Sequence, residues 1–399
     1  MNRKGKIIRA VGLSIVNAIV LFLVCYFADN WRFSILTGPS VGQRIEQARE
    51  VLGWAEDRIP EDYVFINTAY DRELVPVFDE YGLPEGEIDI TDRRKLAEFI
   101  SQLDKKHKYV MIDVLLSDRF KSESDSLLIA EILNTENIGI ARSSTAKLPD
   151  ERLIPKSGYT DYATDIYETN FVKYEFLKNG NETLPYKVFL SEKPEEKLTS
   201  YGPFLFHNGR LAWKSLTLRF PIKLWNDTKA WDEANMQEKV ILNLGADILD
   251  MGVDIPELVK DKTVVIGDFR EDDIHDTYMG KIAGPVININ ALEALRNNEL
   301  EIPWWIVVFL LALYTGITFF VFLSDKYNNL INNLLNHIRL RNKFIRYLLS
   351  FVGFSVLFAI ISGIIYLVSG VDINILLPSL WFTFLYGIKK HFSNVEIYE

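Results

Sequence analysis

The chain has 399 residues, of which 48% are hydrophobic and 25% charged, and its formal net charge is −10. It is too long for one ordinary domain. The negative charge argues against a nucleic-acid-binding protein, which normally carries a basic patch or stripe. The single cysteine, Cys25, excludes an internal disulfide framework and a cysteine-based zinc site. Because the apolar residues are concentrated in a few blocks, the composition indicates an integral membrane protein with one sizeable polar domain.

Four apolar segments predict membrane-spanning helices. The first contains no charged residue and is long enough, at about 1.5 Å per residue, to cross a hydrocarbon layer of roughly 30 Å. A cleaved signal peptide is the alternative for this segment, but no A-x-A cleavage site follows it. The second opens with an interfacial Trp304–Trp305 pair. The four predicted spans are residues 10–28, 302–323, 347–369 and the shorter 373–388.

The basic residues between these segments predict their orientation. Lysine and arginine cluster before the first span, between the second and third, and after the fourth. By the positive-inside rule, residues 1–9, 324–346 and 389–399 are cytoplasmic, as in a bacterial inner membrane protein with both termini inside. Residues 30–301 then form an extracytoplasmic domain with 33 Lys and Arg against 49 Asp and Glu, a net charge of −16. Solubility is the simplest explanation of this charge.

The outer domain is predicted to be α/β, with a mixed and largely parallel sheet covered by helices. Short continuous apolar runs alternate with helical patterns, which is typical of buried parallel strands. The expected strands are residues 63–67, 109–115, 138–141 and 263–268, and the expected helices are 91–105, 124–134 and 289–300. Residues 158–218, including 170–177, have a more antiparallel pattern. The helix at 289–300 runs almost directly into the second span, with Glu301–Pro303 between them.

Several of these segments resemble the type 2 CHASE domain, an extracytoplasmic sensor family. The segment 260–295 is similar to the family's closing signature, with matches at Gly267, Asp276, Gly284, Asn290 and Ala291. The first half matches at Asp113, Asp118, Asp125 and Ala130, and the central segment 158–176 and Leu184–Pro185 are also similar. The layout of one leading span, a sensor domain and three further spans agrees. Asn67 stands where the family usually has an aspartate, and the usual central Asp-Gly is missing.

The resemblance implies a sensor, and it also implies how the signal would leave the membrane. Family members commonly continue into a cyclase or a kinase, whereas eleven residues, 389–399, follow the last predicted span here. We therefore expect a stand-alone form of the family whose output is a separate cytoplasmic or membrane protein. A structural scaffold subunit with no small-molecule sensing is the main alternative, and an envelope hydrolase is a weaker one.

Acidic residues at the expected strand ends are the candidate ligand contacts. A polar loop that includes Asp268, Asp272 and Asp273 follows the last strand, and ligands of α/β folds sit at such strand ends. A surface loop, or turn and helix-capping aspartates, would give the same pattern. The predicted contacts to a small molecule or envelope protein are Asp113, Asp118, His275, Asp276 and, through the resemblance, Asn290.

No catalytic residue, metal ligand or cofactor is predicted, and the protein is not expected to be an enzyme. There is no G-x-S-x-G motif, and the five histidines have no paired metal-ligand spacing. The predicted spans contain no charged residue, which argues against a transporter. Ser355, Ala359 and Gly363 recur at helical spacing, so this face is expected to pack against another span or a second chain. Residues 328–346 are expected to lie on the inner leaflet or to dock a partner.

Overall fold

The structure is a computed structural model, and it describes residues 3–30, 40–55, 60–78, 81, 83–164, 171–224, 240–270, 272–323 and 343–395. Two compact units divide the chain. The helical unit consists of residues 1–49, 198–213 and 299–399, and the α/β unit consists of residues 50–197 and 214–298. Glu271 and most of the predicted basic loop, including Leu330, Leu334 and Ile338, lie outside the described residues.

A six-stranded parallel sheet with flanking helices forms the centre of the α/β unit, which confirms the predicted α/β class, although the central sheet is wholly parallel where a mixed one was predicted. Its order is β15-β1-β16-β4-β5-β6, and all five neighbouring pairs run parallel. The strands are β15 (Ile241–Asn243), β1 (Tyr63–Asn67), β16 (Thr263–Gly267), β4 (Tyr109–Asp113), β5 (Ile138–Arg142) and β6 (Ser157–Tyr159). The middle strands β1 and β16 are buried along their whole length because helices cover both faces of the sheet.

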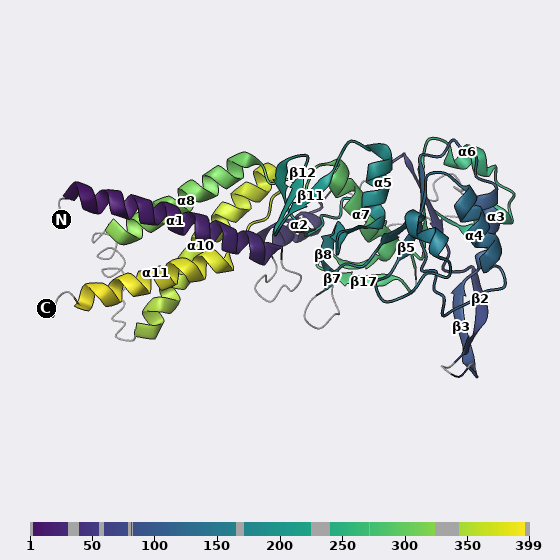
Figure 1. Cartoon of the computed structure of the whole chain (residues 1–399), viewed down its shortest axis with the longest axis horizontal. Helices are drawn as coiled ribbons and strands as arrows, with labels where there is room; N and C mark the ends of the chain where they lie inside the picture. The colour runs from purple at the N-terminus through teal and green to yellow at the C-terminus, as the bar shows by residue number, and fades with distance from the viewer. Residues whose placement is uncertain are drawn as a thin grey trace. The chain divides into compact units, whose positions relative to one another are not determined.

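Side-chain alternation along each strand decides which helices cover which face. Val64 and Ile66 point into a core with Leu96, Phe99 and Leu128, whereas Tyr63 on the opposite face bonds to Glu293. The first face is covered by α3 (Arg93–Ser101), α4 (Asp125–Asn134) and α6 (Ile255–Val259), and the second by α5 (Leu184–Glu192) and α7 (Gly284–Arg296). Figure 1 shows these two groups on opposite sides of the strands.

The helix boundaries follow from local capping. Asp92 accepts hydrogen bonds from the backbone N–H groups of Arg94 and Lys95, both at 3.0 Å, and so begins α3 two residues later than predicted. The predicted helix 289–300 begins earlier, at Gly284, because Pro285 occupies its first turn, where no N–H is needed. It ends at Arg296.

The expected antiparallel region consists of small ladders beside the main sheet. These are β7 (Ala163–Thr164) with β8 (Phe171–Glu175) and β14 (Ser215–Leu216), and β9 (Leu177–Lys178) with β10 (Asn181–Glu182). Residues 198–212, which belong to the helical unit, are antiparallel as well. The antiparallel hairpin of β17 (Ile274–Thr277) and β18 (Gly280–Ala283) lies outside the predicted region. A further hairpin, β2 (Arg72–Phe78) and β3 (Pro84–Thr91), was not predicted. It extends away from the rest of the α/β unit (Figure 1).

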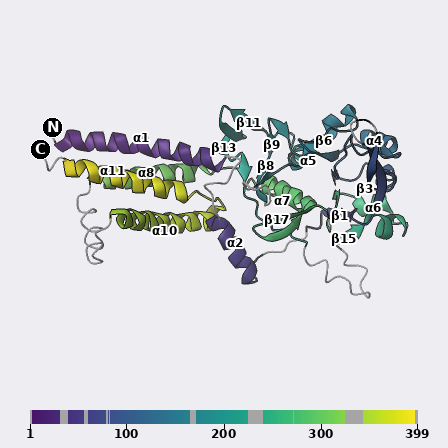
Figure 2. The same ribbon diagram turned by 90° about the horizontal axis from the view of Figure 1, so that it is seen from below.

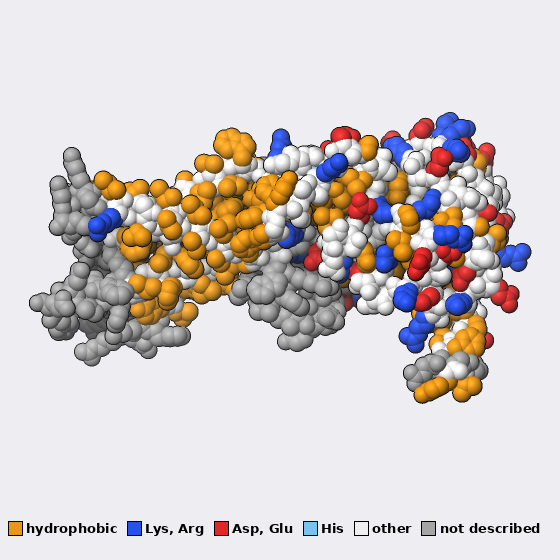
Figure 3. All heavy atoms as spheres, viewed as in Figure 1, with side chains coloured by type: hydrophobic (Ala, Val, Ile, Leu, Met, Phe, Trp, Pro, Cys, Tyr) orange, Lys and Arg blue, Asp and Glu red, His pale blue; other side chains and the backbone are white. Residues whose placement is uncertain are grey.

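The described part of the helical unit contains four long helices, which lie side by side (Figure 2). They are α1 (Arg3–Asp29), α8 (Trp304–Leu323), α10 (Lys343–Ser369) and α11 (Leu376–Val395). Among the described residues, three segments are long and apolar enough to cross a membrane, Ile7–Asp29, Trp304–Phe322 and Tyr347–Ser369, which indicates a membrane protein. The fourth predicted span corresponds to the shorter apolar segment Leu376–Ile388. Figure 3 shows hydrophobic side chains over the visible surface of these helices.

Polar side chains connect the long helices. Asn17 of α1 donates to Thr318 Oγ1 of α8 at 2.8 Å and accepts a hydrogen bond from Trp381 Nε1 of α11 at 2.9 Å. The amide of Asn17 therefore links three helices, and α11 belongs to the same packed group as the three longer apolar segments. The start of α1 and the end of α11 lie at the same end of this unit (Figure 1).

The predicted small-residue face of α10 lies beside its buried face. Phe354, Phe358 and Ile365 are buried against the other helices, whereas Ser355, Ala359 and Gly363 are only partly covered. Within the described residues, a Cβ atom added to Gly363 would contact Val41, the first residue of α2 (Val41–Val51). Packing against a second chain stays a prediction.

Residues 198–213 form a small sheet that packs with the helical unit. Its strands are β11 (Leu198–Tyr201), β12 (Phe204–His207) and β13 (Arg210–Ala212). Tyr26 of α1 donates to the carbonyl of Ala212 at 2.9 Å, and the backbone N–H of Leu205 donates to the Tyr26 hydroxyl at 3.2 Å. The segment before α8 bonds to the last strand, because Ile302 N donates to Leu211 O at 2.8 Å. The second span is therefore preceded by an extended, sheet-paired segment.

Candidate functional site

The carboxyl end of β4 carries an acidic side chain that is hydrogen-bonded to another element of the α/β unit. Asp113 is the last residue of β4 and pairs in register with Gly267, the last residue of β16. Its Oδ2 accepts a hydrogen bond from Asn288 Nδ2 of α7 at 2.6 Å. Asn288 Oδ1 in turn accepts from the hydroxyl of Tyr174 in β8, at 2.7 Å. The carboxyl is thus fixed by a helix and a strand that are far apart in sequence.

A second chain of polar contacts belongs to the same site. His275 Nε2 lies 2.7 Å from Asp273 Oδ1, and His275 Nδ1 is hydrogen-bonded to the hydroxyl of Tyr162. The rings of Tyr162 and His275 pack edge to face at 4.8 Å between centroids. The charges of Asp113 and Asp273 both raise the pKa of the Tyr162 hydroxyl. Asp113 and Pro285 both lie against Gly267, and Asp273 lies against Gly284, the residue before Pro285. We call Asp113, Tyr162, Tyr174, Asp273, His275 and Asn288 the Asp113 cluster.

Two glycines allow the close approach of the elements that carry this cluster. A Cβ atom at Gly284, the first residue of α7, would lie 2.1 Å from Asp273 Oδ2, and the Gly284 N–H donates to the Asp273 carbonyl at 2.7 Å. A Cβ atom at Gly267 would lie 2.5 Å from Cγ of Pro285. Any larger side chain would separate the β17 hairpin and the α7 terminus from the ends of the parallel strands.

Burial and like charge change the titration of the cluster. Burial and the neighbouring carboxylate of Asp273 raise the pKa of Asp113 to about 8. The hydrogen bond from Asn288 opposes this rise only in part. Burial and the carboxylates of Asp273, Asp113 and Asp161 raise the pKa of the Tyr162 hydroxyl. At neutral pH, Asp113 therefore holds a proton and Tyr162 keeps its own. The cluster presents a neutral carboxyl, a phenol and an imidazole, which can donate and accept hydrogen bonds to a polar ligand.

The predicted contact residues fall in different places. Asp113 and His275 are both in the Asp113 cluster. Asp276 follows His275 in β17 and therefore points to the opposite face of the hairpin. It is exposed and pairs in register with Lys281. Asp118 is exposed on the loop after β4, where its N–H donates to the Lys147 carbonyl at 3.0 Å.

Asn290 is buried in α7 and bonds to the backbone around it. Its Nδ2 donates to the carbonyls of Ile222 and Val286, both at 2.7 Å, and its Oδ1 accepts from the Ile222 N–H at 3.2 Å. These bonds fix residues near 222 against α7. Sequence analysis missed Tyr162, Tyr174 and Asn288. Only Asn288 had a visible signal, the Asn-x-Asn spacing at the start of α7.

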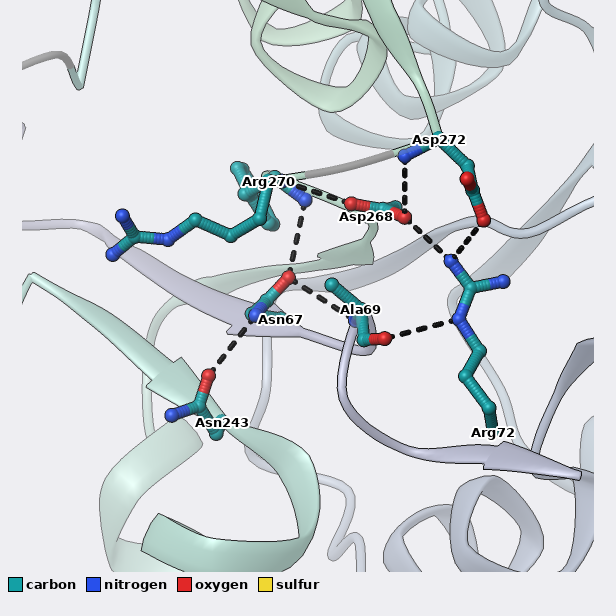
Figure 4. A network of polar contacts seen from close by, with 8 residues as sticks. Asn67, Ala69, Arg72, Asn243, Asp268, Arg270 and Asp272 are labelled. Atoms are coloured by element: carbon teal, nitrogen blue, oxygen red, sulfur yellow. Dashed lines mark hydrogen bonds and ion pairs between the residues drawn. The ribbon is translucent and has the colours of Figure 1, made fainter.

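The acidic loop after β16 forms a separate network, shown in Figure 4. Arg72 Nη2 contacts Asp268 Oδ2 and Asp272 Oδ2, both at 2.6 Å, and Arg72 Nε donates to the Ala69 carbonyl at 3.0 Å. Asp268 also accepts from the N–H groups of Arg270 and Asp272. Both carboxylates thus bind an arginine of this chain, and we call this network the Arg72 clamp.

Asn67 completes the same region at the end of β1. Its Oδ1 accepts from the N–H groups of Ala69 and Phe269, at 3.2 and 3.1 Å, and its Nδ2 donates to Asn243 Oδ1 at 3.0 Å. A neutral amide can both donate and accept, so it connects the ends of three neighbouring strands (Figure 4). An ionised aspartate at this position would lack the donor to Asn243.

Among the described residues, no group of three or more His, Cys, Asp or Glu side chains is arranged to hold a metal ion. The chain was also compared with protein-family models, curated proteins and solved structures, and none of the three comparisons found a match.

Proposed function

We propose that the protein is a membrane-anchored sensor whose α/β unit binds a small polar molecule at the Asp113 cluster. The observation that carries this proposal is the placement of a proton-holding carboxyl, an imidazole and a phenol at the carboxyl ends of parallel strands, where α/β proteins bind ligands. Asn288 of α7 and His275 of the β17 hairpin both contribute to the cluster, so a ligand there would change how these two elements are held.

The sequence resemblance to the type 2 CHASE domain supports the same function. In this proposal the α/β unit lies outside the cytoplasmic membrane of a bacterium, with four spans in the bilayer and both termini inside, the orientation that the positive-inside rule favours. The polar contacts of Asn17 with Thr318 and Trp381 favour α11 as a fourth span, since they link it to α1 and α8. A signal would pass to a separate output protein. A ligand can shift this system only by binding one conformation more tightly than another.

Hydrogen–deuterium exchange of the full chain in nanodiscs tests this function. The probe is the small-molecule fraction of a cell extract. We expect slower exchange at the start of α7 and in β17, and no such change in the H275A variant. A chain carrying D118N, an exposed aspartate outside the cluster, serves as the control and should respond like the wild type. If no extract fraction changes exchange in α7 or β17, the sensor proposal is wrong.

A structural scaffold is the second candidate, and the exposed β2–β3 hairpin favours it. A scaffold would hold another protein without responding to small molecules. The exchange experiment separates the two, since a scaffold gives the same exchange pattern with every extract fraction.

A further inference from the structure

The hairpin formed by β2 and β3, residues 72–91, has one buried and one exposed face. Val75 is 3% exposed and Ile90 is also buried, so one face packs on the α/β unit. Residues on the other face, spaced by two along β2, are Leu74, Pro76 and Phe78. Leu74 is 68% exposed and Phe78 is 52% exposed, where an antiparallel hairpin usually carries polar residues on the solvent side.

The acidic residues of β3 lie beside this apolar row. In the ladder, Asp89 pairs with Leu74 and Glu87 pairs with Pro76, so both carboxylates are on the same face as the apolar residues. Residues 72–91 contain six Asp and Glu and one Arg, a net charge of −5. The face is therefore apolar along one strand and acidic along the other.

The root of the hairpin is held firmly. Arg72, the first residue of β2, is bound by Asp268 and Asp272 in the Arg72 clamp. Asp71, just before it, accepts from Lys95 Nζ at 2.7 Å and from the Gly245 N–H at 2.9 Å. Glu73 accepts from the Arg93 N–H at 2.9 Å. These contacts orient the hairpin, whereas its outer part is a two-stranded ladder, which alone is marginally stable in water.

We propose that this hairpin is a docking arm for a basic, partly apolar surface of another protein. The exposed leucine and phenylalanine provide apolar contact area, and Glu87 and Asp89 select lysine or arginine on the partner. The same hairpin of a second copy does not fit, since that contact would set one acidic face against another. The inference is independent of whether the Asp113 cluster binds a ligand.

A defined peptide tests the arm on the full chain in detergent. The probe is a capped, fluorescently labelled decapeptide of alternating lysine and valine, followed by anisotropy, with a glutamate–valine decapeptide as its charge control. We expect the lysine peptide to bind, with an affinity that falls as salt is raised, and the glutamate peptide to bind far more weakly. L74S/F78S should weaken binding about tenfold or more, and E87Q/D89N should weaken it and flatten its salt dependence.

Matched controls keep the outcome clear. L127S/I154S removes two half-exposed apolar side chains elsewhere in the α/β unit and should bind the peptide like the wild type, as should D113N. Equal binding of the lysine peptide by L74S/F78S and L127S/I154S would refute the docking-arm proposal. A concentration-dependent dimer that L74S/F78S abolishes would instead identify a second copy as the occupant and overturn the proposal. Circular dichroism melts confirm that each variant is folded.

Discussion

Replacing Asp113 with asparagine should stabilise the α/β unit, and more so as the pH rises. The pKa of Asp113 is raised from 3.8 to about 8 by burial and by Asp273. Between these two values the unfolded chain releases the proton and the folded chain keeps it, so the unfolded state binds fewer protons. Stability therefore falls as pH increases across this window and levels off above the folded pKa. Asparagine keeps an acceptor for Asn288 and has no proton to lose.

The size of this stability difference follows from the pKa shift of Asp113. Each pH unit between the two pKa values changes the free energy of unfolding by about 1.4 kcal/mol. The difference between D113N and the wild type should therefore grow by about 3 kcal/mol from pH 5 to pH 7, reaching about 4 kcal/mol at pH 7.

Pulse proteolysis in urea measures this difference on the full chain in detergent, since the protease cleaves the unfolded α/β unit. D113E is the matched control because it keeps a titratable carboxyl, so its stability should fall with pH as that of the wild type does. Parallel stability profiles for D113N and the wild type from pH 5 to pH 7 would refute the reasoning and mean that Asp113 is ionised in the folded state.

Three further outcomes are expected. R72M removes the guanidinium from the carboxylates of Asp268 and Asp272, so the α/β unit should lose about 3 kcal/mol and β2 should exchange faster in hydrogen–deuterium exchange; an unchanged β2 would contradict the clamp. G284A sets a Cβ atom against Asp273 and should cost about 1–3 kcal/mol in urea unfolding, whereas G353A, where a Cβ meets open space, should cost nothing. N17L breaks the hydrogen bonds to Thr318 and Trp381, so it should destabilise the helical unit by about 1 kcal/mol in thermal melts in detergent. A melting curve equal to that of the wild type would exclude this link between the helices.

Sequence reasoning located most of the central sheet and the long apolar helices. Four of the six parallel strands were expected within two residues of their observed ends, because a strand buried on both faces must be apolar throughout. The short strands β6 and β15 were not singled out, since three residues are too few for a pattern. The hairpin β2–β3 was missed as well: Pro76 interrupts β2, and the acidic residues of β3 weaken its alternation.

The residues of the candidate site were also only partly predictable from the sequence. Asp113 and His275 could be selected because they follow apolar strands and are polar. Tyr162 and Tyr174 looked like any other aromatic residues, since nothing in their neighbouring sequence says that a hydroxyl will reach His275 or Asn288. Asp268 and Asp272 were part of a polar loop for which both a ligand site and a plain surface loop were open, and the fold instead pairs them with Arg72, which lies almost two hundred residues earlier.

What the sequence by itself determined is the division into apolar helices and an acidic α/β part, since hydrophobic period and length are local properties of the chain. Only the tertiary structure decided which polar groups meet. A carboxyl becomes a proton-holding group or an ion-pair partner according to its burial and its neighbours, and those neighbours come from strands and helices that only folding brings together.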